Sequence, residues 1–209
     1  NEKNGVVWLS YPALEAEPFI CHGFSTRLGG VSRDHLSEMN LSFQRGDDPE
    51  NVHENYKRIA AAIGFDEKDL VLSQQTHPTN IRKVTQEDRG RGITRPLGYT
   101  DVDGLITDVP GLVLGTSFAD CVPLFFADPV HKAVGLSHSG WKGTVGKIGK
   151  RTVERMAEEY GTDPADIIAA IGPSICQNCY EVSEDVIAEF REAFAEKYHG
   201  ELFYRKENG

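Results

Sequence analysis

Short runs of apolar residues recur along the chain, and several are bounded by Gly, Pro or Asp, which is typical of β-strands. The runs are four to seven residues long, which is too short for an independent helix. They lie at residues 6–9, 70–73, 81–84, 112–118, 122–126, 133–136 and 167–171. We therefore predict seven strands distributed over most of the chain.

Three other segments have apolar residues at helical spacing. In the first, Asp48 is suited to the N-cap, Pro49 to the first helical position and Gly64 to the C-terminal stop. The second segment covers residues 144–160, and the third covers 183–198 with two acidic residues in its first turn. Strands and helices mixed without strict alternation predict a single-domain mixed α/β sandwich.

The overall charge excludes some classes of function. The chain has 209 residues with 32 acidic and 22 basic side chains, a formal net charge of −10, which argues against a general nucleic-acid binder. Its densest basic cluster, residues 89–95, is short and is interpreted as a mobile, solvated loop. No apolar run approaches the roughly 20 residues that span a bilayer, so no membrane partner is expected. Four cysteines are too few for a disulfide scaffold, which favours a cytoplasmic location.

Three residues with metal-binding chemistry follow predicted strands: His77, Cys121 and His138. Side chains at strand ends can converge on one rim of a sheet. Two imidazoles and one thiolate are a known zinc ligand set that leaves a fourth position for water or substrate. The gaps of 44 and 17 residues match no local zinc signature, so a buried cysteine with two surface histidines remains an alternative at this point.

A second candidate site lies in the glycine-rich segment 22–32. Ser25 and Thr26 offer hydroxyl groups, and Arg27 offers a planar fork of donors that fits phosphate oxygens. The segment lacks the Gly-Lys-Ser/Thr ending of a Walker loop. A phosphate clamp and an ordinary glycine turn between strands both fit this pattern.

Asp120, Cys176 and Cys179 are further candidates for catalytic or reactive residues. Asp120, next to Cys121, is a candidate general acid or base, with a structural carboxylate as the alternative. Cys176 and Cys179 form a lone CxxC in a loop before a helix, with no second CxxC to complete a zinc knuckle. We interpret this pair as structural or incidental.

Taken together, the motifs resemble those of the YfiH-like family, also labelled the laccase-domain or polyphenol-oxidase family. The matching segments are 22–32, 40–42, 46–48, 74–77, 103–107, 119–123, 138–144, 171–175 and 179–182. The resemblance implies one domain over residues 1–209 and a zinc ion held by His77, Cys121 and His138, with copper as a second choice. Family members continue further with a Cys-Thr segment and a Ser/Tyr-Arg-Arg region, so we expect this chain to lack a C-terminal segment.

The resemblance also implies an activity. It indicates a zinc-dependent purine nucleoside phosphorylase that takes purine nucleosides and phosphate, with adenosine deaminase and methylthioadenosine phosphorylase activity. Arg27 would bind phosphate together with Ser25 and Thr26. The remaining implied binding residues, which shape the pocket or place a cation beside the metal, are Asn40, Gln75 and Lys142.

Other activities remain open or are excluded. A hydrolase that edits peptidoglycan precursors and a non-catalytic zinc- or phosphate-binding module are the alternatives. Multicopper laccase chemistry is not expected, because the seven histidines include no His-x-His pair. The sequence leaves the oligomeric state open.

Overall fold

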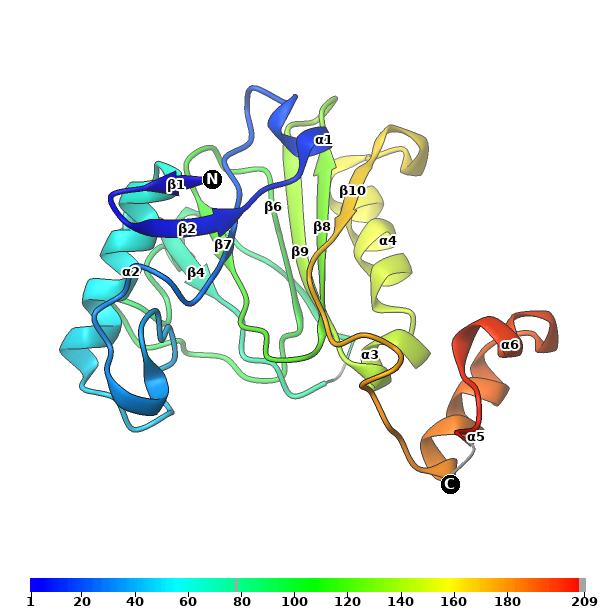
Figure 1. The fold of residues 1–209 in the computed structure, drawn as a ribbon. Coiled ribbons are helices and arrows are strands. Elements are labelled where there is room, and N and C mark those ends of the chain that lie inside the picture. Colours follow the sequence, from blue (N-terminus) through cyan, green and yellow to red (C-terminus); the bar gives the residue numbers. More distant parts are fainter. Residues whose placement is uncertain (78, 207–209) are drawn as a thin grey trace.

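A five-stranded sheet forms the centre of the molecule (Figure 1). The computed structural model describes residues 1–77 and 79–206. The strands follow the order β10 (Ile168–Ile171), β8 (Val122–Asp128), β9 (Ala133–Ser139), β6 (Gly104–Thr107) and β5 (Ile81–Lys83). Neighbouring strands are antiparallel except β5 and β6, which are parallel. Helix α4 (Ile148–Tyr160) covers one face, and its fully buried Met156 packs with Ile106 and Phe126 of the sheet.

Two smaller sheets complete the strand framework. One is the parallel pair β4 (Leu70–Leu72) and β7 (Val113–Gly115), and the other is the antiparallel set β1 (Glu2–Lys3), β2 (Val6–Leu9) and β3 (Phe24–Ser25). Helix α2 (Pro49–Ile63) packs against both, because Ile59 belongs to a buried cluster with Val6, and Tyr56 to a cluster with Leu70. In Figure 1 the sheets lie between α2 on one side and α4 on the other.

The remaining helices are short. They are α1 (Pro12–Glu15), α3 (Trp141–Val145), α5 (Glu184–Ala193) and α6 (His199–Leu202). The last two form the orange and red end of the chain in Figure 1, where α5 contacts α3. No helix in residues 1–77 and 79–206 is both long and apolar enough to cross a membrane.

The strand predictions are confirmed in position, and with them the mixed α/β fold class. Each of the seven apolar runs overlaps one strand, although most strands differ from their run by one or a few residues at the ends. Three strands were missed, namely β1, β3 and β6. All four residues of β6 are buried, so it has neither the polar alternation nor the length that identifies a half-exposed strand. The domain range 1–209 stays a prediction.

The helix predictions vary in accuracy. Helix α2 has the predicted ends: the Asp48 carboxylate accepts a hydrogen bond from the Glu50 amide at 3.0 Å, and Gly64 has a φ of +115°. The predicted helix 144–160 is wrong at its start, because Lys147 has left-handed backbone and α4 begins one residue later. The first two residues of the predicted helix, Thr144 and Val145, belong to the separate helix α3, and the break between α3 and α4 lies at Gly146 and Lys147.

The third predicted helix, 183–198, is too long. Helix α5 ends at Ala193, and Phe194 has extended backbone with φ −125° and ψ 143°. The ring of Phe194 stacks on Phe190 with centroids 5.8 Å apart. The apolar spacing therefore continues past the end of the helix, into a 3₁₀ turn and α6.

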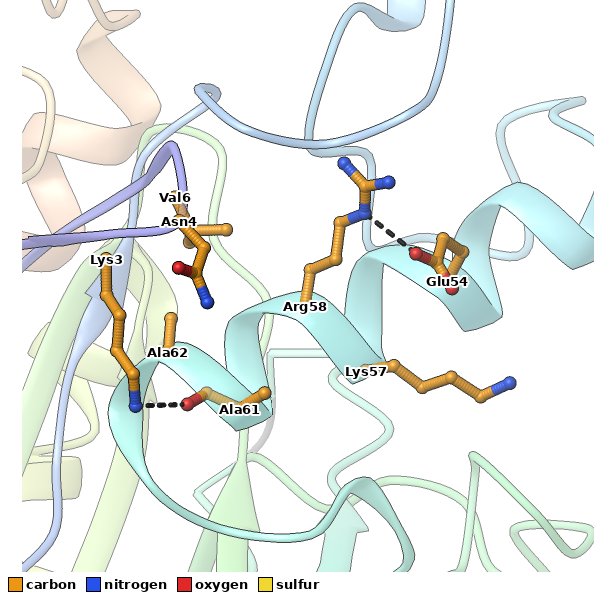
Figure 2. A pocket seen from close by; sticks show the side chains of 8 residues that line it. All are labelled: Lys3, Asn4, Val6, Glu54, Lys57, Arg58, Ala61 and Ala62. Atoms are coloured by element: carbon orange, nitrogen blue, oxygen red, sulfur yellow. Dashed lines mark hydrogen bonds and ion pairs between the residues drawn. The ribbon is translucent and has the colours of Figure 1, made fainter.

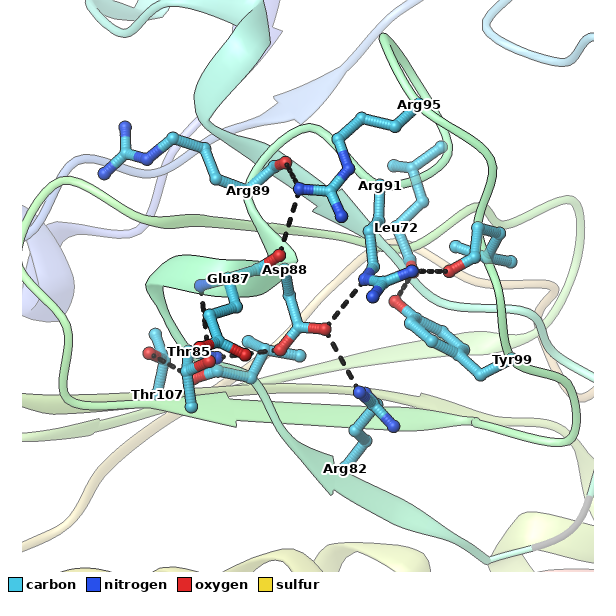
Figure 3. A network of polar contacts seen from close by, with 12 residues as sticks. Leu72, Arg82, Thr85, Glu87, Asp88, Arg89, Arg91, Arg95, Tyr99 and Thr107 are labelled. Atoms are coloured by element: carbon cyan, nitrogen blue, oxygen red, sulfur yellow. Dashed lines mark hydrogen bonds and ion pairs between the residues drawn. The ribbon is translucent and has the colours of Figure 1, made fainter.

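Arginines of the connection between β5 and β6 make internal contacts (Figure 3). The parallel pairing of these strands requires a crossover, and this connection supplies it. The nearly buried Asp88 accepts hydrogen bonds from Arg82 Nη2 at 3.1 Å and Arg91 Nε at 2.9 Å, while Arg95 Nη1 donates to the carbonyl of Glu87 at 3.0 Å. The interpretation of this basic cluster as a solvated loop was therefore wrong for the partly buried Arg91, whereas Arg95 is exposed as expected, although its guanidinium donates to the backbone of the crossover.

Candidate metal centre and adjoining cavity

Two connections lead from the two-stranded sheet to the five-stranded sheet, and each carries one candidate metal ligand. His77 lies in the connection from β4 to β5, and Cys121 is the last residue of the connection from β7 to β8. The third candidate, His138, lies within β9, opposite Pro123 of β8. The structure brings one potential ligand atom from each of these three residues within 4.8 Å of the others. Cys121 thus lies between two strands, as expected, whereas His138 lies inside β9 and not after its end.

A buried carboxylate orients this cluster. Asp103 is 0% exposed, and its Oδ1 lies 2.8 Å from Nδ1 of His138. Because an ionised carboxylate only accepts hydrogen bonds, Nδ1 carries the proton and Nε2 of the ring is left as a neutral donor to a metal. The same carboxylate accepts hydrogen bonds from the amides of Thr76 at 3.0 Å and His77 at 3.1 Å. Asp103 therefore positions two of the three ligands.

The absence of a side chain at Gly140 leaves room for the cluster. A Cβ at this position would lie 2.8 Å from Cδ2 of His77 and 3.1 Å from Sγ of Cys121. Gly140 has φ −75°, a conformation open to any residue, so space rather than backbone freedom requires glycine here. The donor set and the space around it fit a tetrahedrally coordinated ion with one position left open.

The thiol of Cys121 is held in its protonated form by its surroundings. Burial raises its pKa, and the negative charges of Asp120 and Asp103 raise it further. A bound cation acts in the opposite direction, because a thiol that coordinates a metal ion is deprotonated. The two carboxylates then become favourable neighbours of the ion, which supports a cationic occupant for this site.

Gln75 ties together the two ligand-bearing connections. Its Nε2 donates to the carbonyl of Ser117 at 2.5 Å, and its Oε1 accepts hydrogen bonds from the Ser117 amide and the Ser73 hydroxyl, both at 3.1 Å. Ser73 and Gln75 belong to the connection that contains His77, and Ser117 belongs to the one that contains Cys121. The amide of Gln75, predicted to shape the pocket, therefore fixes the spacing of the two connections.

The predicted phosphate-binding residues Ser25, Thr26 and Arg27 line one cavity of about 980 Å³, together with Asn40. Phe118 lines the same cavity, and its ring centroid lies 5.7 Å from that of His138. The aromatic ring thus connects the cavity wall with the cluster of potential ligands.

Several polar groups in this wall already have partners. The Thr26 hydroxyl donates to the carbonyl of Val7 at 2.7 Å, and Nε and Nη2 of Arg27 donate to the carbonyl of Ser37 at 3.1 and 2.5 Å. The Asn40 amide donates to the carboxylate of Asp47 at 2.9 Å. Thr26 and Asn40 are therefore tied into the fold, while Arg27 retains further N–H donors.

Asp120 and Lys142 lie outside the residues that line the cavity. Both side chains are exposed. The backbone carbonyl of Asp120 accepts a hydrogen bond from the Ile175 amide at 3.0 Å. Lys142 follows Gly140 by two residues, and its Nζ lies 5.4 Å from the ring centroid of Trp141. Asp120 is next to a potential ligand in the chain, whereas Lys142 is directed over an aromatic ring.

Asp103 and Asn55 were missed as site residues by sequence reasoning. Asn55 is 0% exposed on α2, where its Oδ1 accepts from the Val31 amide and its Nδ2 donates to the Ser32 hydroxyl, both at 2.8 Å. It therefore holds the end of the glycine-rich segment against the helix. A polar residue on the apolar face of a predicted helix was the signal for Asn55, and the first position of the family-matching segment 103–107 was the signal for Asp103.

A second, smaller pocket of about 430 Å³ lies between β1 and α2 (Figure 2). Three cationic side chains line it: Lys3, Lys57 and Arg58. Nζ of Lys3 donates to the carbonyl of Ala61 at 2.9 Å, and Arg58 pairs with Glu54 at 2.8 Å. None of the residues predicted to bind metal, phosphate or nucleoside lines this pocket.

Curated proteins of similar sequence are named as enzymes of purine nucleosides. The chain is 44% identical over 174 residues to purine nucleoside phosphorylase of Deinococcus radiodurans, which covers 83% of this chain and 64% of the relative. It is 41% identical over 173 residues to purine nucleoside phosphorylase YlmD of Bacillus subtilis, covering 82% and 62%. It is also 39% identical over 172 residues to adenosine deaminase RL5 of an unknown prokaryotic organism, covering 81% and 65%. The matches thus span just under two thirds of each of these relatives.

Solved structures and a family model give the same grouping. The fold matches that of Bacillus licheniformis hypothetical protein YfiH with a TM-score of 0.84 and 38% identity, covering 90% of this chain and 70% of the other. It matches YlmD from Geobacillus stearothermophilus with a TM-score of 0.84 and 34% identity, covering 94% and 72%. Residues 21–208 match the family model described as multi-copper polyphenol oxidoreductase laccase. The chain therefore belongs to this laccase-domain family, whose relatives include YfiH-like purine nucleoside phosphorylases.

Proposed function

We propose that this chain carries the site of a zinc-dependent purine nucleoside phosphorylase, which converts a purine nucleoside and phosphate to the free base and ribose 1-phosphate. Adenosine deaminase and methylthioadenosine phosphorylase activities are included in the proposal. The observation that carries it is the convergence of His77, Cys121 and His138 within 4.8 Å beside a cavity lined by Arg27, in a chain 44% identical to a purine nucleoside phosphorylase.

The ligand set favours zinc over copper. Two imidazoles and one thiolate are common zinc ligands with an open fourth position, and the hydrogen bond from His138 to Asp103 is typical of such sites. When bound, zinc supplies Lewis acidity and lowers the pKa of water. Multicopper laccase chemistry stays outside the proposal, because three convergent ligands account for one metal ion.

Arg27 and Ser25 are the proposed phosphate donors. Arg27 uses Nε and Nη2 on the Ser37 carbonyl, which fixes the plane of the guanidinium and leaves N–H groups of Nη1 for an anion. Among the described residues, the Ser25 hydroxyl has no hydrogen-bond partner, so it is free to donate to phosphate. The Thr26 hydroxyl already donates to Val7, so its role is to position the loop.

Phosphate held in this way acts as the nucleophile. One of its oxygens bonds to the anomeric carbon while the bond from that carbon to the purine nitrogen breaks, and the electron pair passes to the base. The sugar develops positive charge in the transition state, which the adjacent phosphate dianion stabilises. Asp120, exposed beside Cys121, is the proposed general acid or base for the proton that the leaving purine takes up.

The activity test uses the zinc-loaded chain with adenosine or inosine and phosphate. Free base and ribose 1-phosphate are the expected products, and ammonia release from adenosine tests the deaminase activity. Zinc bound at one equivalent without turnover of any nucleoside would overturn the phosphorylase assignment. Turnover of muramyl-peptide precursors in place of nucleosides would replace it with a hydrolase that edits peptidoglycan precursors.

Two variants test the residue roles. Cys121→Ala should lose both zinc and activity, while Cys21→Ala, which changes an exposed free cysteine outside the three-residue cluster, should keep zinc. Arg27→Lys should raise the KM for phosphate by about tenfold or more, because a lysine lacks the planar fork. Arg33→Lys, at the exposed position directly after the glycine-rich segment, is the matched control. Full activity of Cys121→Ala would contradict the metal-centre proposal.

A further inference from the structure

The loop after β10 returns to the metal centre and carries two cysteines. The amide of Ile175 donates to the carbonyl of Asp120 at 3.0 Å, directly beside Cys121 in the chain. One residue later in the loop, Cys176 begins a turn in which its carbonyl accepts from the amides of Cys179 at 3.0 Å and Tyr180 at 3.1 Å. The turn therefore lies between the metal centre and the end of the chain.

The two thiols of this turn are already in contact. Sγ of Cys179 lies 3.2 Å from Sγ of Cys176, and both residues are exposed and reduced. The turn is closed by its own backbone hydrogen bonds, so joining the sulfurs requires little movement of the chain. Oxidants in solution can reach both sulfurs, because neither residue is covered by another part of the described structure.

The surroundings make the two thiols chemically unequal. The hydrogen bond with Cys179 lowers the pKa of Cys176, and the same interaction raises the pKa of Cys179. Burial raises the pKa of both other cysteines, Cys21 and Cys121. Cys176 is thus the cysteine with the largest thiolate fraction, and a thiolate is the nucleophile in disulfide exchange.

We propose that Cys176 and Cys179 are a redox-active dithiol that reacts with low-molecular-weight disulfides and closes to an intramolecular disulfide beside the metal centre. In the first step the Cys176 thiolate attacks one sulfur of the small disulfide, forms a mixed disulfide and releases one small thiolate. In the second step Cys179 loses its proton to solvent and attacks the Cys176 sulfur, which releases the other small thiolate. The protein loses two electrons, and the small disulfide is reduced to two thiols.

Closure would fix a turn that anchors the end of the described chain. Nε2 of Gln177 donates to the carbonyls of Glu201 and Leu202 at 3.2 and 3.4 Å, and the Tyr204 hydroxyl donates to Asn178 Oδ1 at 2.9 Å. Both anchoring side chains lie between the two cysteines. The disulfide would therefore restrict the contacts of this turn with the α6 segment and, through the adjoining Ile175, the contact with Asp120. This inference does not depend on the phosphorylase activity.

The experiment treats the reduced, zinc-loaded chain with oxidised glutathione in the absence of oxygen. After an acid quench and alkylation, peptide mass spectrometry should find a bond between Cys176 and Cys179, with Cys21 still alkylated as a free thiol. Dithiothreitol should restore alkylation of the pair. The proposal is overturned if both thiols stay free under conditions that oxidise a small dithiol, if a stable glutathione adduct accumulates, or if Cys121 takes part in the bond.

Single variants test the two steps. Cys179→Ser should trap glutathione on Cys176, and Cys176→Ser should likewise stop at a mixed disulfide, because neither variant keeps the second thiol that completes the intramolecular bond. Cys21→Ser is the matched control and should leave disulfide formation unchanged. The double variant of the pair should bind as much zinc as the wild type. Loss of one zinc equivalent in that variant would identify the pair as a metal site and overturn the proposal.

Discussion

Replacing Asp103 with Asn removes the charge that positions two candidate ligands while keeping the shape of the side chain. The carboxylate accepts three hydrogen bonds, from Nδ1 of His138 at 2.8 Å and from the amides of Thr76 and His77 at 3.0 and 3.1 Å. An asparagine can keep only one of its two terminal atoms as an acceptor. If its oxygen faces His138, its NH₂ group faces the two backbone N–H groups.

The expected cost follows from these contacts. Each backbone N–H left without an acceptor in this partly buried position costs about 1–2 kcal/mol, so Asp103→Asn should lower the free energy of unfolding by about 2–4 kcal/mol. Loss of the charged partner of a metal-binding imidazole weakens metal affinity by about 10–100-fold. That range corresponds to about 1.4–2.8 kcal/mol of binding free energy.

Two measurements check this expectation. Urea denaturation of the metal-free protein, followed by circular dichroism, gives the change in unfolding free energy, and zinc titration against a chromophoric chelator gives the change in Kd. Asp101→Asn is the matched control, since Asp101 also accepts a hydrogen bond from Thr76 but is exposed and has a φ of +59°, which asparagine tolerates. An Asp103→Asn protein with wild-type urea midpoint and zinc affinity would refute the reasoning.

Three further predictions follow from single side chains. Gly140→Ala should weaken zinc binding about tenfold or more by crowding the two ligands it faces, whereas Gly149→Ala in α4 should keep zinc binding and raise the urea midpoint. Asp47 has a pKa lowered to about 2 by hydrogen bonds, so its stabilisation is present above pH 3.8 and disappears as pH falls through about 2. Urea midpoints of Asp47→Asn should therefore lie below wild type at neutral pH and meet it near pH 2, and parallel profiles would contradict this. Asn55→Ala should lower the free energy of unfolding by about 2–4 kcal/mol, and an unchanged urea midpoint would contradict the role given to its buried amide.

Features fixed by local chemistry were predictable from the sequence. The ends of α2 depend on Asp48, Pro49 and Gly64, which act on backbone groups within a few residues of themselves. The apolar runs likewise predicted the positions of their strands, because each run is a continuous local stretch of the sequence. By contrast, the break before α4 lies at Lys147, a non-glycine residue with a φ of +57°, and the local apolar pattern does not indicate a left-handed residue there.

The ligands of the candidate metal centre could be predicted from their residue types, whereas the residues that hold those ligands in place could not. Soft and imidazole ligands near strands pointed to His77, Cys121 and His138, and the structure brings these three together. Asp103 was not predicted as a site residue, because its hydrogen-bond partners lie 26 to 35 residues away along the chain. Its role therefore exists only in the folded molecule. The same holds for Gln75, whose partner Ser117 is 42 residues distant.

The placement of the ligands on two connections and on β9 has a consequence for how the molecule opens. A fluctuation that parted the two-stranded and five-stranded sheets would have to break the core they share, in which Val71 of β4 packs with Leu105 of β6. An ion held by His77, Cys121 and His138 spans both connections, so the same fluctuation would have to release it. The binding free energy of the ion is then added to the free energy needed to separate the two sheets. Hydrogen exchange in the sheets would slow together, and the two sheets would open as one cooperative unit.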